Sequence, residues 1–270
     1  MSEPRCCSRA RAPHALARAL LGGAAALLAA SAATPAAAAD HSNIEEGLPI
    51  EVEDAFPIAY RGRELQGRFR YERQDGGEDQ YLLEPRLELG VLPNAQVRIG
   101  SRFLMGPADR TTSRDVDLEG LYNFNQESVL LPAFALSARA RFPTGVDSAG
   151  VDTRVKALAT KTLGPAPRME RVHLNVAWDH EAAAGAGERS DRYLVVVGYS
   201  MRLDPDTILV ADFVRQQERE HGADANIVEA GLRYQLTPQT VLVAGAGAGI
   251  GEESPDVRAT VGFQHSLSWP

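Results

Sequence analysis

Apolar and charged residues alternate along most of this chain after its first forty positions. In residues 63–73, Leu65 and Phe69 fall on one face of an extended segment, whereas Arg68 and Arg70 fall on the other. A period of two indicates a β-strand with one apolar and one charged face. Long charged side chains are costly to bury without partners, so this face must meet water, either outside a soluble protein or inside a water-filled barrel.

The same alternation recurs with the spacing of a membrane barrel. Tight connections at 92–94, 203–206 and 237–239 alternate with longer polar ones, such as 105–114 and 179–190, and this alternation is typical of outer-membrane barrels. We therefore predict an all-β fold, a single antiparallel transmembrane β-barrel over residues 64–267 with short periplasmic turns and longer extracellular loops. Its twelve strands are expected at 64–73, 81–91, 95–103, 115–124, 132–142, 151–162, 171–179, 191–202, 207–216, 226–236, 240–250 and 257–267.

The apolar face suits contact with lipid. Leu87, Leu89, Leu136 and Leu232 lie on it, and aromatic residues gather near strand ends, as two interfacial girdles require. After residue 40 no apolar run approaches the ~18 residues of a membrane helix. A soluble periplasmic β-barrel, with the charges outside and the apolar stripes as its core, remains an alternative because the alternation is the same from either side.

The charged face predicts the lining of a narrow lumen. Charges of both signs would form ladders of ion pairs across neighbouring strands, and twelve strands enclose less space than the sixteen of a porin. We therefore expect a restricted channel. The lumen-lining candidates are Arg68, Arg70, Glu84, Arg86, Glu88, Arg98, Glu119, Arg139, Arg141, Asp152, Arg154, His173, Glu229, Arg233 and Arg258.

Two segments precede the predicted barrel. Residues 1–39 resemble a signal peptide: four arginines and an Ala-rich stretch lead to four alanines before Asp40. These residues carry four arginines and Glu3, a net charge of +3, so the net charge of the mature chain is −8 − 3 = −11. A chain this acidic is a poor partner for nucleic acid. Residues 40–63 lack periodicity and are expected to be a periplasmic lead-in that plugs the lumen or lies across its mouth.

The sequence offers little for catalysis. His173, Asn175 and Asp179 share a strand face, but no serine stands beside them in a nucleophile motif, and no histidine or cysteine cluster has metal-ligand spacing. A histidine in a polar lumen is the better interpretation. We expect a protein that is not an enzyme, and we nominate no catalytic, cofactor-binding or metal-binding residues and no cofactor.

Six short phrases follow one another over nearly all of the mature chain, at residues 47–55, 83–90, 142–145, 159–161, 173–175 and 229–234. In their order and spacing they resemble the outer-membrane β-barrel family named for the meta-pathway of phenol degradation. The chain departs from the usual aromatic final residue of outer-membrane barrels, because Pro270 closes it. The resemblance implies uptake of small, often aromatic molecules and brings no catalytic residues with it.

Together these features predict a channel or facilitator in the cell outer membrane, reached through a cleaved signal peptide. It would pass small, hydrophobic or aromatic molecules down their gradient. Its partners would be membrane lipid, the solute and, during biogenesis, the barrel-assembly machinery, but no nucleic acid. The alternative from another class is a structural or lipid-modifying outer-membrane barrel with a closed lumen, in which His173 would be the residue to mutate.

Overall fold

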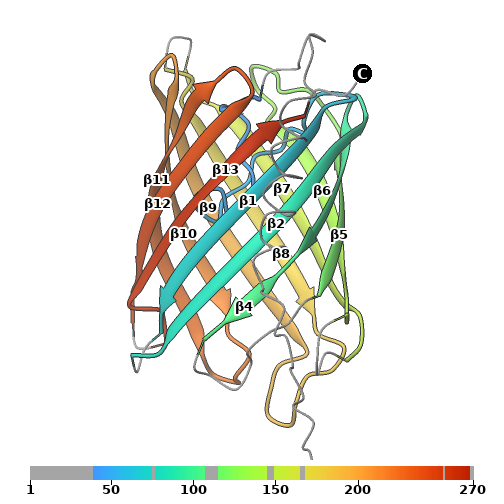
Figure 1. Cartoon of the computed structure of the whole chain (residues 1–270), viewed down its shortest axis with the longest axis vertical. Coiled ribbons are helices and arrows are strands. Elements are labelled where there is room, and N and C mark those ends of the chain that lie inside the picture. Colours follow the sequence, from blue (N-terminus) through green and yellow to red (C-terminus); the bar gives the residue numbers. More distant parts are fainter. Residues whose placement is uncertain are drawn as a thin grey trace, which may run out of the picture. The chain divides into compact units, whose positions relative to one another are not determined.

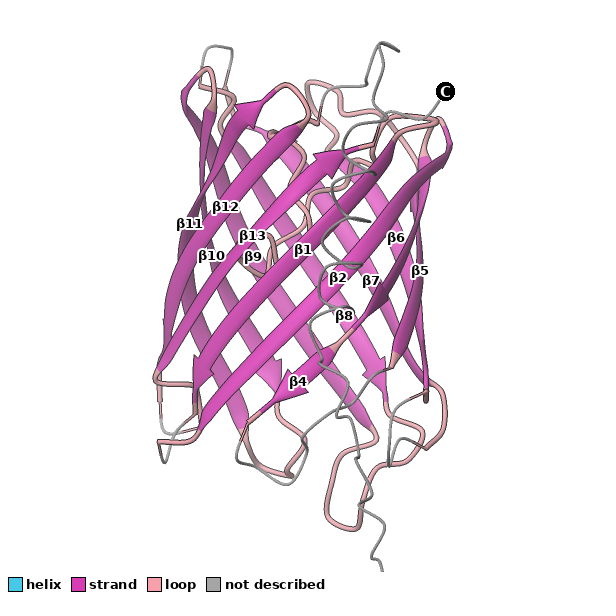
Figure 2. Cartoon of the chain, in the orientation of Figure 1, coloured by secondary structure: helices cyan, strands magenta, loops and turns pink. Residues whose placement is uncertain are grey.

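Thirteen β-strands form the wall of the protein (Figures 1 and 2). The computed structural model describes residues 39–74, 77–106, 115–144, 149–164, 168–251 and 253–267, so the predicted signal peptide lies outside the described residues, apart from Ala39. The strands are β1 (Arg63–Arg73), β2 (Asp79–Leu92), β3 (Ala95–Ser101), β4 (Phe103–Met105), β5 (Val116–Asn123), β6 (Ala133–Phe142), β7 (Asp152–Thr162), β8 (Arg171–His180), β9 (Asp191–Asp204), β10 (Thr207–Gln217), β11 (Asp224–Thr237), β12 (Thr240–Gly249) and β13 (Val257–Ser266).

The sheet closes on itself. All strand pairings are antiparallel, and β1 pairs with both β2 and β13, from Glu64 opposite Ser266 to Arg73 opposite Val257 (Figure 1). Both β3 and β4 pair with β2, so they are two parts of one wall strand interrupted at Arg102. The predicted closed barrel of twelve strands is therefore confirmed, and each predicted strand boundary is correct to within two residues.

The connections differ between the two ends of the barrel. At one end, which we call the turn end, three of the five connections contain only two residues, at 93–94, 205–206 and 238–239. At the opposite loop end, the six connections contain between five residues, at 74–78, and ten, at 181–190. This asymmetry is the one that the sequence predicted.

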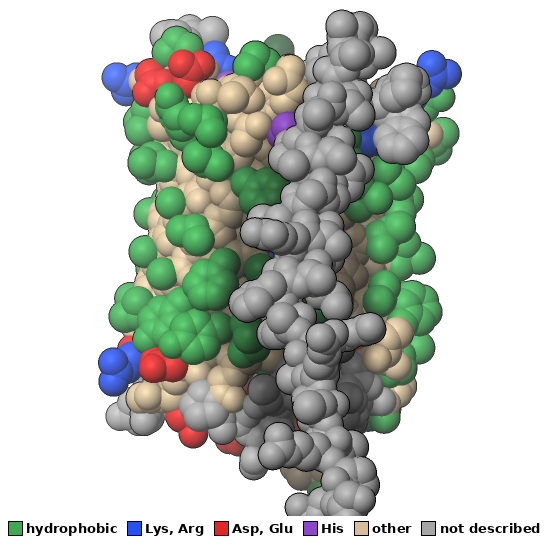
Figure 3. Space-filling model, viewed as in Figure 1, with side chains coloured by type: hydrophobic (Ala, Val, Ile, Leu, Met, Phe, Trp, Pro, Cys, Tyr) green, Lys and Arg blue, Asp and Glu red, His purple; other side chains and the backbone are tan. Residues whose placement is uncertain are grey.

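Apolar side chains cover the outside of the wall. On β11, Val228 and Leu232 are 48% and 43% exposed, whereas the alternating residues Glu229 and Arg233 are buried inside. On the face shown in Figure 3, charged side chains appear only near the two rims. The soluble alternative requires the opposite arrangement, with apolar residues inside and charges outside, and is therefore wrong.

Aromatic rings gather near the ends of the wall strands. Near the loop end, the Tyr71 and Tyr81 rings lie 5.5 Å apart, and Trp178 stacks on His180. Tyr122 and Phe124 make an edge-to-face pair at the turn end, with centroids 5.2 Å apart. These positions correspond to the two girdles of membrane barrels. No helix among the described residues is long and apolar enough to cross a bilayer.

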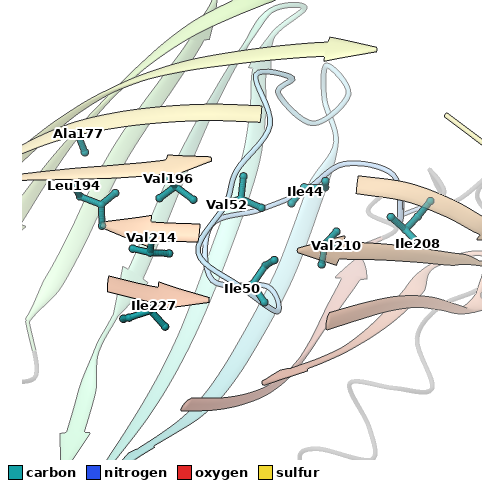
Figure 4. Close-up of a cluster of buried hydrophobic side chains, with 10 residues drawn as sticks. All are labelled: Ile44, Ile50, Val52, Ala177, Leu194, Val196, Ile208, Val210, Val214 and Ile227. Atoms are coloured by element: carbon teal, nitrogen blue, oxygen red, sulfur yellow. The ribbon is translucent and has the colours of Figure 1, made fainter. Parts of the chain in front are cut away.

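Residues 39–62, which we call the plug, fold inside the barrel. Ile44, Ile50 and Val52 of the plug pack against apolar side chains of the wall (Figure 4). Leu194 and Val196 of β9 belong to that cluster, which explains why this strand is apolar on both faces: its inner face meets the plug. The hydrophobic core of the molecule therefore lies between plug and wall.

Candidate channel lumen

Side chains of the wall bind the main chain of the plug. The Val52 amide donates to Asp212 Oδ2 on β10 at 2.8 Å. Asn175 on β8 bonds both main-chain groups of Glu53, accepting from its amide and donating to its carbonyl oxygen, each at 2.8 Å. These side chains make the hydrogen bonds that a neighbouring strand would otherwise make with an extended segment. Buried backbone N–H and C=O groups require such partners.

The same pattern continues toward the barrel's other side. Thr160 Oγ1 accepts from the Ala55 amide at 3.0 Å, and Asn123 donates to the Ala55 carbonyl oxygen at 2.7 Å. The Ile58 amide donates to Gln96 Oε1 at 2.7 Å. From Val52 to Ile58, polar side chains of five wall strands therefore bind one extended peptide.

Two arginines bind carbonyl groups of the plug's first half. Arg233 is completely buried and donates to the Leu48 carbonyl oxygen at 2.6 Å and to the His41 carbonyl oxygen at 2.9 Å. Arg86 donates to the Glu46 carbonyl oxygen at 2.8 Å. Each arginine crosses from the wall to the plug, so these charges serve as anchors as well as lumen lining.

Arg98 lies at the centre of a buried carboxylate cluster. Its Nη2 contacts Glu45 and Glu53 of the plug, the latter at 3.0 Å, and Glu88 of β2 at 2.9 Å. Its Nη1 contacts Glu119 of β5 at 3.2 Å. Charge-assisted hydrogen bonds of this kind are stronger than neutral ones, and removing one partner of a buried group is strongly destabilising.

Glu46 of the plug is held by three cations of the wall. Arg139 Nη2 and Lys156 Nζ contact its Oε2 at 2.5 and 2.6 Å, and Arg154 Nη1 contacts its Oε1 at 2.8 Å. Glu46, Glu53 and Glu119 bring carboxylate oxygens within 4.8 Å of one another, a spacing that could suit a metal ion. Arg98, Arg139 and Lys156 already supply the positive charge among these carboxylates, so the geometry favours ion pairs over a metal site.

The plug separates two cavities in the lumen. One, of about 220 Å³, lies toward the turn end and is lined by Asp54, Phe56 and Arg171 among others. The other, of about 250 Å³, lies toward the loop end, and we call it the vestibule. The charged described residues that line the vestibule are Arg68, Arg70, Arg102, Arg139, Arg141, Arg154, Arg192, Arg258, Glu46, Glu51, Glu72 and Asp179.

The vestibule has a surplus of positive charge in its lining. Eight arginines face four carboxylates there, and two of the four, Glu46 and Glu51, belong to the plug. Arg70 contacts Glu51 at 3.1 Å, which is a further ion pair between the wall and the plug at this surface. An oriented excess of guanidinium groups favours anions over cations in a narrow lumen.

His173 lies in a neutral hydrogen-bond chain inside the wall. Its Nδ1 is 3.1 Å from Thr160 Oγ1, and its Nε2 is 3.0 Å from Ser200 Oγ on β9. Sequence reasoning missed Ser200, because only the pairing of β8 with β9 brings it near His173. Both His173 and Ser200 are at most 3% exposed on the inner side of the barrel, and Thr160 also binds the plug. Neither side chain lies on the apolar outer face of the wall.

The structure places the predicted lumen-lining side chains on the inner face. Those that are largely buried are Arg68, Arg70, Glu84, Arg86, Glu88, Arg98, Glu119, His173, Glu229, Arg233 and Arg258. Arg139, Arg141, Asp152 and Arg154 are half-buried; all four line a smaller cavity, and the three arginines also line the vestibule. Sequence reasoning missed the plug residues Glu45 and Glu46 as part of this network. The available signal was the acidic run of residues 45–54 preceding arginine-rich strands.

The chain resembles known channels in its fold. No protein-family model and no curated protein matches it. Among solved structures, the COG4313 outer membrane channel from Pseudomonas putida F1 aligns with a TM-score of 0.62 and 10% identity, over 83% of this chain and all of that one. The NanC porin aligns at 0.56 and 12%, over 76% of this chain and 100% of that one. The KdgM porin aligns at 0.50 and 14%, over 75% and 99%. The structural alignments show a shared outer-membrane barrel fold, and at identities this low they show the fold alone.

Proposed function

We propose that this protein is an outer-membrane channel for small molecules, closed at rest by its own N-terminal plug. The observation that carries the proposal is a polar lumen with a cavity on each side of a plug that continues into β1 and is otherwise held in the lumen by non-covalent contacts. Solute would move down its gradient once the plug shifts. The structures that resemble this chain are channels and porins, and this supports the same role.

Several finer features belong to this proposal. Residues 1–39 act as a cleaved signal peptide, the barrel-assembly machinery inserts the chain, and the apolar outer wall contacts lipid. The solutes are small and partly hydrophobic or aromatic, as the resemblance to the phenol meta-pathway family implies. The inner apolar cluster around Val196 and Val210 offers such a solute a surface once the plug is displaced.

Planar-bilayer recording with the full mature chain tests the channel role. Wild-type protein is expected to show rare openings, and a variant with a weakened plug, such as Gly198→Val, frequent ones. Migration on a denaturing gel with and without boiling verifies that each sample is a folded barrel. A folded Gly198→Val barrel that never conducts would contradict the proposal.

The lipid-modifying alternative depends on His173 and now also on Ser200. Hydrolysis would require a phospholipid ester to reach Ser200 Oγ, with His173 as the general base about 3 Å from that oxygen. The pair instead faces the plug and lies behind the wall. Phospholipid release that disappears in both His173→Ala and Ser200→Ala would revive this alternative.

A further inference from the structure

We propose that the vestibule binds small organic carboxylates, and that a bound carboxylate opens the channel by replacing Glu46 of the plug. The inference rests on the proposed channel function and adds its substrate class and its opening step. The plug's own carboxylate would then occupy, in the closed state, the site that the solute's carboxylate takes in the open one.

The site around Glu46 has the composition of an anion site. Arg139 reaches both carboxylate oxygens, with Nη2 at 2.5 Å from Oε2 and Nη1 at 3.4 Å from Oε1. Arg154 and Lys156 complete it from β7. A planar guanidinium beside two further cations matches the geometry of any carboxylate, whether it belongs to the protein or to a solute.

The site is reachable from the loop end. Glu46, Arg139 and Arg154 all line the vestibule, whereas Glu53, a neighbouring plug carboxylate, does not. Arg70 also lines the vestibule, and its buried Nη2 has no hydrogen-bond partner although Nη1 is bonded to Glu51. A buried guanidinium N–H without a partner favours a nearby anion, because such a group is costly to leave unsatisfied.

The exchange of one carboxylate for another preserves the charge of the site. Each of its three cations keeps a second partner when Glu46 leaves: Arg139 keeps Glu119 at 2.6 Å, Arg154 keeps Asp179 at 2.6 Å, and Lys156 keeps Glu53. A monovalent carboxylate therefore restores the charge balance that Glu46 provided. A neutral solute does not, and removing one member of a buried ion network without replacement is strongly unfavourable.

Apolar groups beside the arginines define the rest of the solute. Leu82, Leu104 and Leu194 line the same vestibule, and Leu194 continues into the apolar cluster that holds Ile50 and Val52 of the plug. A small acid with an apolar body fits this combination, with its carboxylate on the arginines and its body against the leucines.

Benzoate and benzyl alcohol provide a matched pair of probes, since they share a ring and differ in charge. We would record single channels of the full mature protein at constant ionic strength while adding either compound at the loop end. Benzoate is expected to raise the open probability in a saturating manner, whereas benzyl alcohol leaves it unchanged. Equal opening by both compounds, or by neither while the channel conducts, would overturn the inference.

A comparison of Glu46→Gln with Glu53→Gln distinguishes the replacement of Glu46 by a solute carboxylate from a general loosening of the plug. Both substitutions remove one buried plug carboxylate, but only residue 46 lines the vestibule. Glu46→Gln should open without benzoate and lose its benzoate response, and Glu53→Gln should keep that response. The same benzoate response in both variants would refute the role of Glu46.

A further variant, and the conductance of the folded protein, keep the outcomes distinct. If Glu46→Gln does not assemble, Arg154→Gln at the half-buried edge of the site should shift the benzoate response to higher concentrations, and an unchanged response would count against the inference. If no folded variant conducts under any condition, the channel function itself fails. If the channel conducts without regard to benzoate, only the carboxylate inference fails.

Discussion

Arg233 Nη1 donates a hydrogen bond to the Leu48 carbonyl oxygen at 2.6 Å, and this contact joins strand β11 to the plug. Arg233→Met should leave the carbonyl groups of Leu48 and His41 without their donor, at a cost of about 1–3 kcal/mol for each buried group. Hydrogen exchange of the plug amides should accelerate while exchange in the wall strands does not. Arg215→Met is the matched control, because Arg215 is exposed and bonds Asp224 at the loop end. Equal exchange in the two variants would contradict this anchoring role.

Gly198 on β9 provides a way to displace the plug without changing any charge. A Cβ atom at this position would lie 2.5 Å from Val52 Cγ2, so Gly198→Val should push the plug away from the wall. Overpacking of this kind costs about 1–3 kcal/mol, which here opposes plug binding. Bilayer conductance measures the effect. Gly120→Val is the control, because its added Cβ meets no atom closer than 4.0 Å, and its conductance should match the wild type.

Leu232 tests the depth of the outer wall in the membrane. It lies near the middle of β11 with its side chain exposed, so Leu232→Arg should lower the free energy of unfolding by ~2–4 kcal/mol in lipid. Leu236 is on the same face near the turn end, and Leu236→Arg should cost only ~0–1 kcal/mol. Urea unfolding in liposomes, followed by Trp178 fluorescence, compares the two. Equal costs would argue against a membrane-spanning position.

Glu127 fixes the connection between β5 and β6 to the end of β7. Burial raises the pKa of this carboxyl, but hydrogen bonds from Lys161 and Thr162 outweigh it and hold the pKa below its usual 4.5. A lowered pKa stabilises the folded connection above the unfolded-state pKa, and this contribution is lost as the pH falls through the folded value. Hydrogen exchange of residues 124–132 should therefore differ between wild type and Glu127→Gln at neutral pH. The difference should disappear in acid, and a constant difference would contradict the assignment.

The sequence predicted the wall well and the plug poorly. Alternation is a local property, so residues 224–237 reveal by themselves which side chains point inward. The position of Glu46 depends instead on Arg139 and Lys156, 93 and 110 residues further along the chain. The plug has no periodicity of its own, and only the closed barrel determines which groups it meets. The apolar inner face at Leu194 is a wall feature that requires the plug for its explanation.

Main-chain binding of the plug has a consequence for how such channels diverge. Asp212, Asn175, Thr160 and Gln96 bind amides that every residue except proline possesses, so most side chains between Val52 and Ile58 can be exchanged without loss of these bonds. A related chain can therefore keep its internal peptide in the same place while the plug side chains outside the ion pairs and the apolar cluster change.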